Sequence, residues 1–171
     1  MEAEMLFKPT IWLKNVLQID KQLLYKLRVR GLLLDLDNTL SMHDNPAAEL
    51  GVTDWLDDMR RLGVKMMIVS NNTEKRVAPL ARELGLDFIA FGCKPLPMGL
   101  HRATKALEKM NIPKSQIALV GDQIFTDILG GNVYGIKTIL VEPFYLEDKW
   151  TFKLKRKIEG AVFRRDFAEK Q

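Results

Sequence analysis

Short runs of apolar residues along the chain each end in a cluster of polar side chains. Four such runs cover residues 31–34, 64–69, 86–91 and 117–120, and a fifth covers Lys137 to Val141. Uninterrupted apolar runs of this length, bounded by polar or turn residues, are typical of parallel strands that are buried on both faces. The pattern therefore predicts five strands in one parallel sheet.

Segments with helical periodicity lie between these runs. A helix is expected over about 54 to 62, with Thr53 as its cap and its end at Gly63. A second is expected after Thr73, ending before Gly85, a third behind Pro97, and a shorter one around 124–134. Helices that alternate with strands predict an α/β fold, a three-layer doubly wound parallel sheet. We expect a single domain over residues 1–171, with a core of about 30–142 and amphipathic extensions at both ends.

The polar clusters should meet at one edge of this sheet, because ligands of open α/β sheets bind at the carboxyl ends of the strands. Asp35 and Asp37 follow the first run and are one residue apart. In an extended backbone both would point the same way. At about 4 Å and an effective dielectric near 20 they would repel by about 4 kcal/mol, so a cation or a shared proton must separate them.

The remaining clusters supply what a magnesium-dependent phosphoryl-transfer site needs. Mg²⁺ is usually held by one or two carboxylates, waters and the substrate phosphate, and Asp35 and Asp122 could be these carboxylates, with Asp127 close by. The Ser70 hydroxyl and the Lys94 ammonium could hold the phosphoryl oxygens. A covalent aspartyl-phosphate step would divide the high barrier of monoester hydrolysis, with one acid attacking and the other moving the proton.

Four motifs of this chain resemble those of the haloacid dehalogenase (HAD) superfamily of phosphatases, in the usual order. They are Asp35-Leu-Asp37-Asn-Thr39, Ser70-Asn71-Asn72, Lys94-Pro95 and Gly121-Asp122-Gln-Ile-Phe-Thr-Asp127. Their wording, spread over about residues 30 to 142, is similar to the YqeG-type subfamily, which is itself similar to phosphatidylglycerophosphate phosphatases. The resemblance implies a HAD-like Rossmannoid fold and the dephosphorylation of phosphatidylglycerophosphate to phosphatidylglycerol, with Mg²⁺ as cofactor.

The same resemblance implies a role for each matching residue. Asp35 would be the nucleophile, and Asp37 would protonate the leaving alcohol and later activate the water. The residues expected to bind the phosphoryl group are Thr39, Ser70, Asn71 and Lys94. Those expected at the metal are Asp35, Asp37 through its backbone carbonyl, Asp122 and Asp127, of which Asp127 could reach the metal through water.

The spacing of the motifs indicates what is missing. Thirty residues separate Thr39 from Ser70 and twenty-three separate Ser70 from Lys94, which leaves room for only a helix and a strand in each interval. Inserted caps of this superfamily occur at those two points, so the chain is expected to be capless. An open site suits a phosphate that is attached to a large molecule or embedded in a surface.

Composition agrees with a globular enzyme. Of 171 residues, 47% are hydrophobic and 28% charged, and no apolar stretch reaches the roughly 18 residues that a membrane span needs. The start of the sequence does not resemble a secretory signal, and Cys93 is the only cysteine, so we expect a cytoplasmic protein. Cys93 is expected to be buried as a small apolar residue.

The two terminal segments could bind a membrane. Residues 149–165 contain seven basic residues and one acidic residue, interleaved with apolar and aromatic ones. Such a segment can lie on an anionic membrane, as a peripheral contact that would suit a phospholipid head group as substrate. A second amphipathic candidate includes Phe7, Ile11 and Trp12. Either segment could instead pack on the sheet.

Other functions fit parts of the pattern. A phosphatase of the same type could act on a soluble or protein phosphate. Nucleic-acid binding is suggested by a pI near 9.2, but the net charge is only +4 and no binding motif is present, so no nucleic acid is expected as a partner. A non-catalytic phosphoacceptor would also group aspartates, a hydroxyl and a lysine, but Asp37 would promote loss of its phosphoryl group. The sequence does not indicate an oligomeric state.

Overall fold

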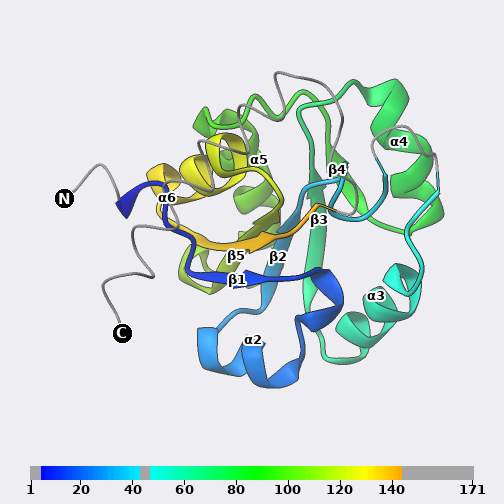
Figure 1. Cartoon of the computed structure of the whole chain (residues 1–171), viewed down its shortest axis with the longest axis horizontal. Coiled ribbons are helices and arrows are strands. Elements are labelled where there is room, and N and C mark those ends of the chain that lie inside the picture. Colours follow the sequence, from blue (N-terminus) through cyan, green and yellow to red (C-terminus); the bar gives the residue numbers. More distant parts are fainter. Residues whose placement is uncertain (1–4, 43–46, 144–171) are drawn as a thin grey trace.

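A six-stranded parallel β-sheet forms the centre of the protein (Figure 1). The computed structural model describes residues 5–42 and 47–143. The strands are β1 (Ile11–Leu13), β2 (Gly31–Leu34), β3 (Lys65–Val69), β4 (Asp87–Ile89), β5 (Ile117–Gly121) and β6 (Lys137–Val141). They lie in the order β1-β6-β5-β2-β3-β4, and every neighbouring pair is parallel. The chain passes from β2 to β3 and β4 and then returns to β5 on the other side of β2, so strand order reverses at β2.

Helices cover both faces of this sheet. They are α2 (Lys21–Leu27), α3 (Val52–Arg61), α4 (Glu74–Glu83), α5 (Pro97–Glu108) and α6 (Leu129–Tyr134), with short turns η1 (Val16–Gln18), η2 (Lys114–Gln116) and η3 (Ile124–Ile128), the last a π-helix. One hydrophobic cluster joins η1, α2, α3 and α4 to one face, and a second joins α5 to the other. Figure 1 shows α5 and α6 on one side of the sheet and α2 and α3 on the opposite side. The predicted three-layer α/β fold is therefore confirmed.

The intervals between the strands are as short as the motif spacing predicted. In the described residues, the interval between Thr39 and Ser70 contains α3 and β3, and the interval between Ser70 and Lys94 contains α4 and β4. Neither holds an inserted domain in that part of the chain, as expected for a capless protein.

The prediction that Thr53 is the N-cap residue of α3 was wrong. The N-cap is Gly51 at φ 86°, a left-handed conformation that glycine adopts without steric cost.

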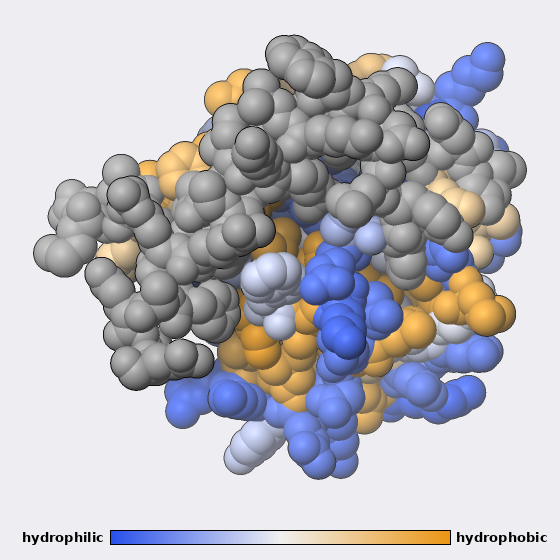
Figure 2. All heavy atoms as spheres, viewed as in Figure 1, coloured by the Kyte–Doolittle hydropathy of each residue, from blue (hydrophilic) through white to orange (hydrophobic). Residues whose placement is uncertain are grey.

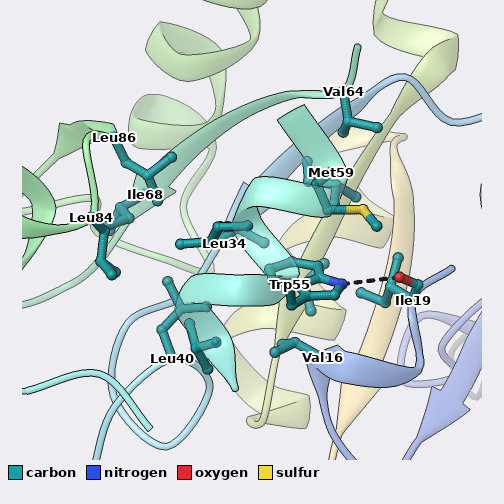
Figure 3. Close-up of a cluster of buried hydrophobic side chains, with 14 of the residues drawn as sticks. Val16, Ile19, Leu34, Leu40, Trp55, Met59, Val64, Ile68, Leu84 and Leu86 are labelled. Atoms are coloured by element: carbon teal, nitrogen blue, oxygen red, sulfur yellow. Dashed lines mark hydrogen bonds between the residues drawn. The ribbon is translucent and has the colours of Figure 1, made fainter. Parts of the chain in front are cut away.

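The larger hydrophobic cluster fixes α3 against the sheet (Figure 3). Trp55 of α3 lies between Val16 and Met59, and its indole nitrogen donates a hydrogen bond of 2.9 Å to the carbonyl oxygen of Ile19. Leu34 of β2 belongs to the same cluster and is fully buried. Because β2 is packed on both faces, the residues that follow it are held in a fixed direction.

The N-terminal segment packs on the core. Its residues Ile11 to Leu13 form an edge strand that pairs with β6, and Val16 and Ile19 are buried. Of the two alternatives for this segment, the structure supports packing on the sheet. Trp12 remains 45% exposed at this edge.

Figure 2 shows one face of the molecule. Hydrophobic residues are visible in the centre of this face, with hydrophilic residues along its lower edge.

The basic segment at residues 149–165 and its predicted membrane contact lie outside the described residues. Among the residues that are described, no helix has the length and apolar character needed to cross a bilayer.

Candidate functional site

The polar clusters predicted at the strand ends meet at the carboxyl edge of the sheet. Asp35 follows β2, and its backbone N–H donates to the Val120 carbonyl of β5 at 2.8 Å, which extends the strand pairing by one residue. Ser70 follows β3, and Asp122 follows β5. Since β2 pairs with both β3 and β5, Asp35 lies level with Val69 and Gly121, and Ser70 and Asp122 follow one residue beyond that level.

Lys94 lies at the centre of the site and pairs with two carboxylates. Its ammonium is 2.6 Å from Asp35 Oδ1 and 2.6 Å from Asp127 Oδ1, and the Lys94 side chain is only 1% exposed. Both acids are buried as well. Burial of an ammonium favours its neutral form, but Asp127 and Asp35 outweigh this and raise the pKa of Lys94. Lys94 is therefore a fixed positive charge between the first and last motifs.

Burial raises the pKa of Asp35 from its ordinary value of 3.8 to about 7. Lys94 opposes this rise, whereas the nearby Asp127 and Asp37 carboxylates add to it. Burial is the largest cause of the rise, and Lys94 alone does not offset it. A further cation beside Asp35 would favour its ionised form, which is the form that can act as a nucleophile.

The carboxylate of Asp127 is held in place by the turn that follows β5. Its Oδ2 accepts a hydrogen bond of 3.1 Å from the backbone N–H of Gln123, and its Oδ1 pairs with Lys94. A Cβ atom on Gly121 would lie 2.3 Å from Asp127 Cγ, so only glycine lets this carboxylate lie over the end of β5. The turn is the π-helix η3, a widened turn that often occurs at functional sites.

Three buried carboxylates could hold a metal ion. Asp35, Asp122 and Asp127 each offer one carboxylate oxygen, and these atoms all lie within 4.8 Å of one another. Oxygen ligands at such spacing suit a hard divalent cation such as Mg²⁺. The donor set therefore fits the predicted metal. The side chain of Asp37 does not belong to this group, and a metal contact through its backbone carbonyl stays a prediction.

Asp37 is held by two donors from the segment after β3. Asn72 Nδ2 donates to Asp37 Oδ2 at 2.5 Å, and Arg76 Nη2 pairs with Asp37 Oδ1 at 2.8 Å. Sequence reasoning missed Arg76. Two signals could have found it. A cation in the first turn of a helix is unfavourable beside the positive end of the helix dipole. Helical side chains also point back toward the N-terminus of their helix, and the N-terminus of α4 faces the site.

Asn71 connects two of the motifs. Its Nδ2 donates to the Lys94 carbonyl at 2.8 Å, and its Oδ1 accepts from the Lys94 backbone N–H at 2.7 Å. Both polar ends of this side chain thus fix the backbone that carries the central lysine. Phosphate binding by Asn71 stays a prediction.

The two hydroxyl groups predicted to bind phosphate have different surroundings. Ser70 Oγ accepts a hydrogen bond of 3.1 Å from the Asn72 backbone N–H and lies at a pocket. Thr39 is fully buried, and within the described part of the chain its Oγ1 has no hydrogen-bond partner. Thr39 does not line the pocket, so its expected contact with a phosphoryl group stays a prediction.

An open pocket of about 160 Å³ gives access to the site. Its lining residues are Asp35, Asp37, Ser70, Asn71, Asn72, Lys94, Gln123 and Thr126. The predicted nucleophile, the predicted acid and the predicted phosphate ligands Ser70 and Lys94 thus face one cavity. Cys93, which was expected to be buried, is exposed: it lies in a turn where Phe91 and Cys93 have φ of 50° and 57°, and it is exposed although its neighbours Gly92 and Lys94 are buried.

The chain is similar in sequence to known phosphatases. The family model described as mitochondrial PGP phosphatase matches residues 1–145. The chain is 37% identical over 156 residues to the probable phosphatase YqeG of Bacillus subtilis (strain 168), covering 91% of this chain and 89% of that protein. It is 25% identical over 167 residues to phosphatidylglycerophosphate phosphatase 1, chloroplastic/mitochondrial, of Arabidopsis thaliana, covering 92% of this chain but only 47% of that protein.

The fold is similar to that of a solved hydrolase of the haloacid dehalogenase-like family from Brucella suis 1330. The TM-score is 0.53 at 13% identity, over 71% of this chain and 92% of the other. At this identity the likeness concerns the fold alone, and it confirms the predicted HAD-like architecture.

Proposed function

We propose that this chain, which belongs to the mitochondrial PGP phosphatase family and is a HAD-type phosphatase, hydrolyses the phosphomonoester of phosphatidylglycerophosphate with the help of Mg²⁺. One observation carries the proposal. Asp35 and Asp37 face the same small pocket, with Asp35 paired to the buried Lys94 and Asp37 held by a separate set of donors. The two acids therefore have different surroundings, as two different roles require.

In the proposed reaction Asp35 attacks phosphorus. A bond forms between its carboxylate oxygen and phosphorus, and the bond from phosphorus to the alcohol oxygen breaks. Asp37 gives its proton to that oxygen, so the alcohol leaves neutral. In the second half Asp37 takes a proton from a water molecule whose oxygen bonds to phosphorus. The bond from phosphorus to the Asp35 oxygen breaks, inorganic phosphate leaves, and both acids return to their starting states.

The other residues of the pocket bind and orient the phosphoryl group. Lys94 and the Ser70 hydroxyl line the pocket beside Asp35 and can donate to phosphoryl oxygens. Asp127 keeps Lys94 in position through their 2.6 Å ion pair. A Mg²⁺ ion held by Asp35, Asp122 and the backbone carbonyl of Asp37 would offset the negative charge of the phosphoryl group and of Asp35.

The dimensions of the site favour a large substrate. A pocket of about 160 Å³ has room for a phosphoryl group and little more, so the alcohol part must lie outside it. Within the described residues no inserted domain closes over this opening. A phosphate at the surface of a lipid aggregate can reach such a site, and the Arabidopsis relative is named for this lipid. The enzyme would then work at the cytoplasmic surface of a membrane.

Phosphate release from a substrate panel tests the proposal. The panel contains phosphatidylglycerophosphate in mixed micelles, glycerol 3-phosphate and a phosphoserine peptide, each with Mg²⁺ and with EDTA. We expect Mg²⁺-dependent turnover that is fastest with the lipid, and no turnover by Asp35→Asn. Faster turnover of glycerol 3-phosphate or of the peptide would replace the lipid with a soluble or protein phosphate. Equal turnover in EDTA would remove Mg²⁺ from the proposal.

A further inference from the structure

Arg76 makes the contacts expected of a residue that positions the acid Asp37. Its Nη2 lies 2.8 Å from Asp37 Oδ1, 3.2 Å from Ser41 Oγ and 3.1 Å from the Met42 carbonyl oxygen. One guanidinium group thus joins α4 to both ends of the turn that follows β2. The Arg76 side chain is 22% exposed, so water screens these contacts only partly.

The second donor to Asp37 comes from the same short segment. Asn72 holds Oδ2, and its backbone N–H donates to the hydroxyl of Ser70. Residues 70–76 therefore carry a predicted phosphate ligand and both donors to the acid. Since each carboxyl oxygen has two lone pairs, Asp37 can accept both hydrogen bonds and still carry or receive a proton. The donors that hold the acid and the hydroxyl expected to bind the phosphoryl group thus come from one continuous segment. This segment fixes how far the acid lies from a bound phosphoryl group.

The turn that carries Asp37 needs such support. Its next residue, Asn38, has φ 60°, a conformation that is uncommon for residues other than glycine. The turn is held internally by a hydrogen bond of 2.6 Å from the Asn38 N–H to the Ser41 carbonyl. Arg76 adds contacts from a different element, so that rotation of Asp37 away from the pocket would break an ion pair.

We propose that Arg76 is a positioning residue that holds the Asp37 carboxyl group in line with the leaving alcohol. The inference rests on the proposed function, in which Asp37 moves the proton. Arg76 does not line the pocket. Its loss should therefore affect proton transfer to the leaving group more than binding of the phosphoryl group.

The test compares two soluble substrates whose leaving groups differ in their need for a proton. Glycerol 3-phosphate releases an alkoxide-like oxygen that must be protonated, whereas p-nitrophenyl phosphate releases a weakly basic phenolate that leaves without a proton. The quantity to measure is kcat/KM with Mg²⁺, because it reports the steps up to release of the alcohol. Water activation by Asp37 in the second half of the reaction is common to both substrates and does not enter it.

In Arg76→Gln we expect kcat/KM to fall about 100-fold for glycerol 3-phosphate and less than about 5-fold for p-nitrophenyl phosphate, since a positioned acid contributes about 10² or more. Arg76→Lys keeps the charge but not the planar donor pair and should restore part of the first loss. Lys75→Gln removes an exposed charge from the adjacent position of α4 and is the matched control. It should leave both values within about twofold, because a surface charge is largely screened.

Equal losses for the two substrates in Arg76→Gln would refute the inference, because they would indicate a general effect on binding or folding. Thermal unfolding of each variant checks the fold. If Arg76→Gln does not fold, the same ratio measured in Arg76→Lys decides, and an unchanged ratio there rejects the role. Absence of turnover by the wild-type enzyme with every substrate would instead reject the proposed function.

Discussion

Replacing Asp35 with asparagine should make the metal-free protein more stable at neutral pH. Asp35 is buried beside other carboxylates, and its pKa in the folded chain is about 7 rather than 3.8. Asparagine has almost the same shape but carries no charge. Its side-chain oxygen can still accept a hydrogen bond from Lys94, which also keeps its ion pair with Asp127. The expected gain in stability is the cost that the ionised carboxylate imposes on the fold.

The size of this gain follows from the pKa of Asp35 in the two states. Between pH 3.8 and pH 7 the unfolded chain has released the proton and the folded chain has not. The folded state therefore binds more protons, and the free energy of unfolding falls as the pH rises, by about 1.4 kcal/mol per pH unit. From pH 5 to pH 8 this amounts to about 3 kcal/mol, and the contribution levels off only above pH 7, where the folded chain has also released the proton.

Urea unfolding of the wild type and of Asp35→Asn in EDTA, at intervals from pH 5 to pH 8, measures this effect. Other titrating groups are common to both proteins and cancel in the difference, which should grow by about 3 kcal/mol over this range and level off above pH 7. Asp87→Asn, which removes an exposed carboxylate at the start of β4, should show no such growth. A difference that stays constant with pH, or a destabilised Asp35→Asn, would show that the reasoning about buried charge is wrong.

Three further predictions concern residues that hold the site and the core. Gly121→Ala would place a Cβ atom 2.3 Å from Asp127 Cγ, so we expect kcat/KM to fall at least about tenfold while far-UV circular dichroism is retained; unchanged activity would contradict this. Gly99→Ala should lower the free energy of unfolding in urea by about 1–3 kcal/mol, because the new Cβ would lie 2.3 Å from the backbone oxygen of Gly92. This clash outweighs the gain of about 1 kcal/mol in helix propensity, so a stabilised variant would contradict the prediction. Trp55→Phe should cost about 1–3 kcal/mol in the same assay, because a buried carbonyl loses its hydrogen bond; a neutral result would mean that another donor replaces the indole.

The central strands, and the side chains that gather where these strands end, could be predicted from the sequence because both depend on local pattern. β2 and β5 are fully buried, so each reads as an unbroken apolar run, and the polar residue that ends each run is also the one that reaches the site. In a parallel sheet all such ends lie at one edge. The meeting of Asp35 with Lys94 could therefore be expected although 59 positions separate them.

Contacts that depend on tertiary packing could not be predicted in this way. β1 has only three residues and is fixed by long-range bonds such as that from the Thr10 N–H to the Thr138 carbonyl, so its local sequence looked like an amphipathic segment of unknown location. The contact of Arg76 with Asp37 depends on how α4 lies over the sheet, so the position of Arg76 in the first turn of α4 does not by itself identify its partner. The exposure of Cys93 arises from the path of one turn, which hydrophobicity does not encode.

The charges of the site link cation binding to phosphate binding. The four aspartates at positions 35, 37, 122 and 127 are matched, in the described part of the chain, by the two cationic side chains of Lys94 and Arg76. This leaves an excess of negative charge in the site. Burial is the main cause of the raised pKa of Asp35, and the Asp127 and Asp37 carboxylates add to it. A phosphate dianion would add to the excess, and each like-charge pair at about 4 Å costs about 4 kcal/mol at an effective dielectric near 20. A divalent cation removes the excess, so the same ion that favours an ionised nucleophile also lets the phosphoryl group approach it.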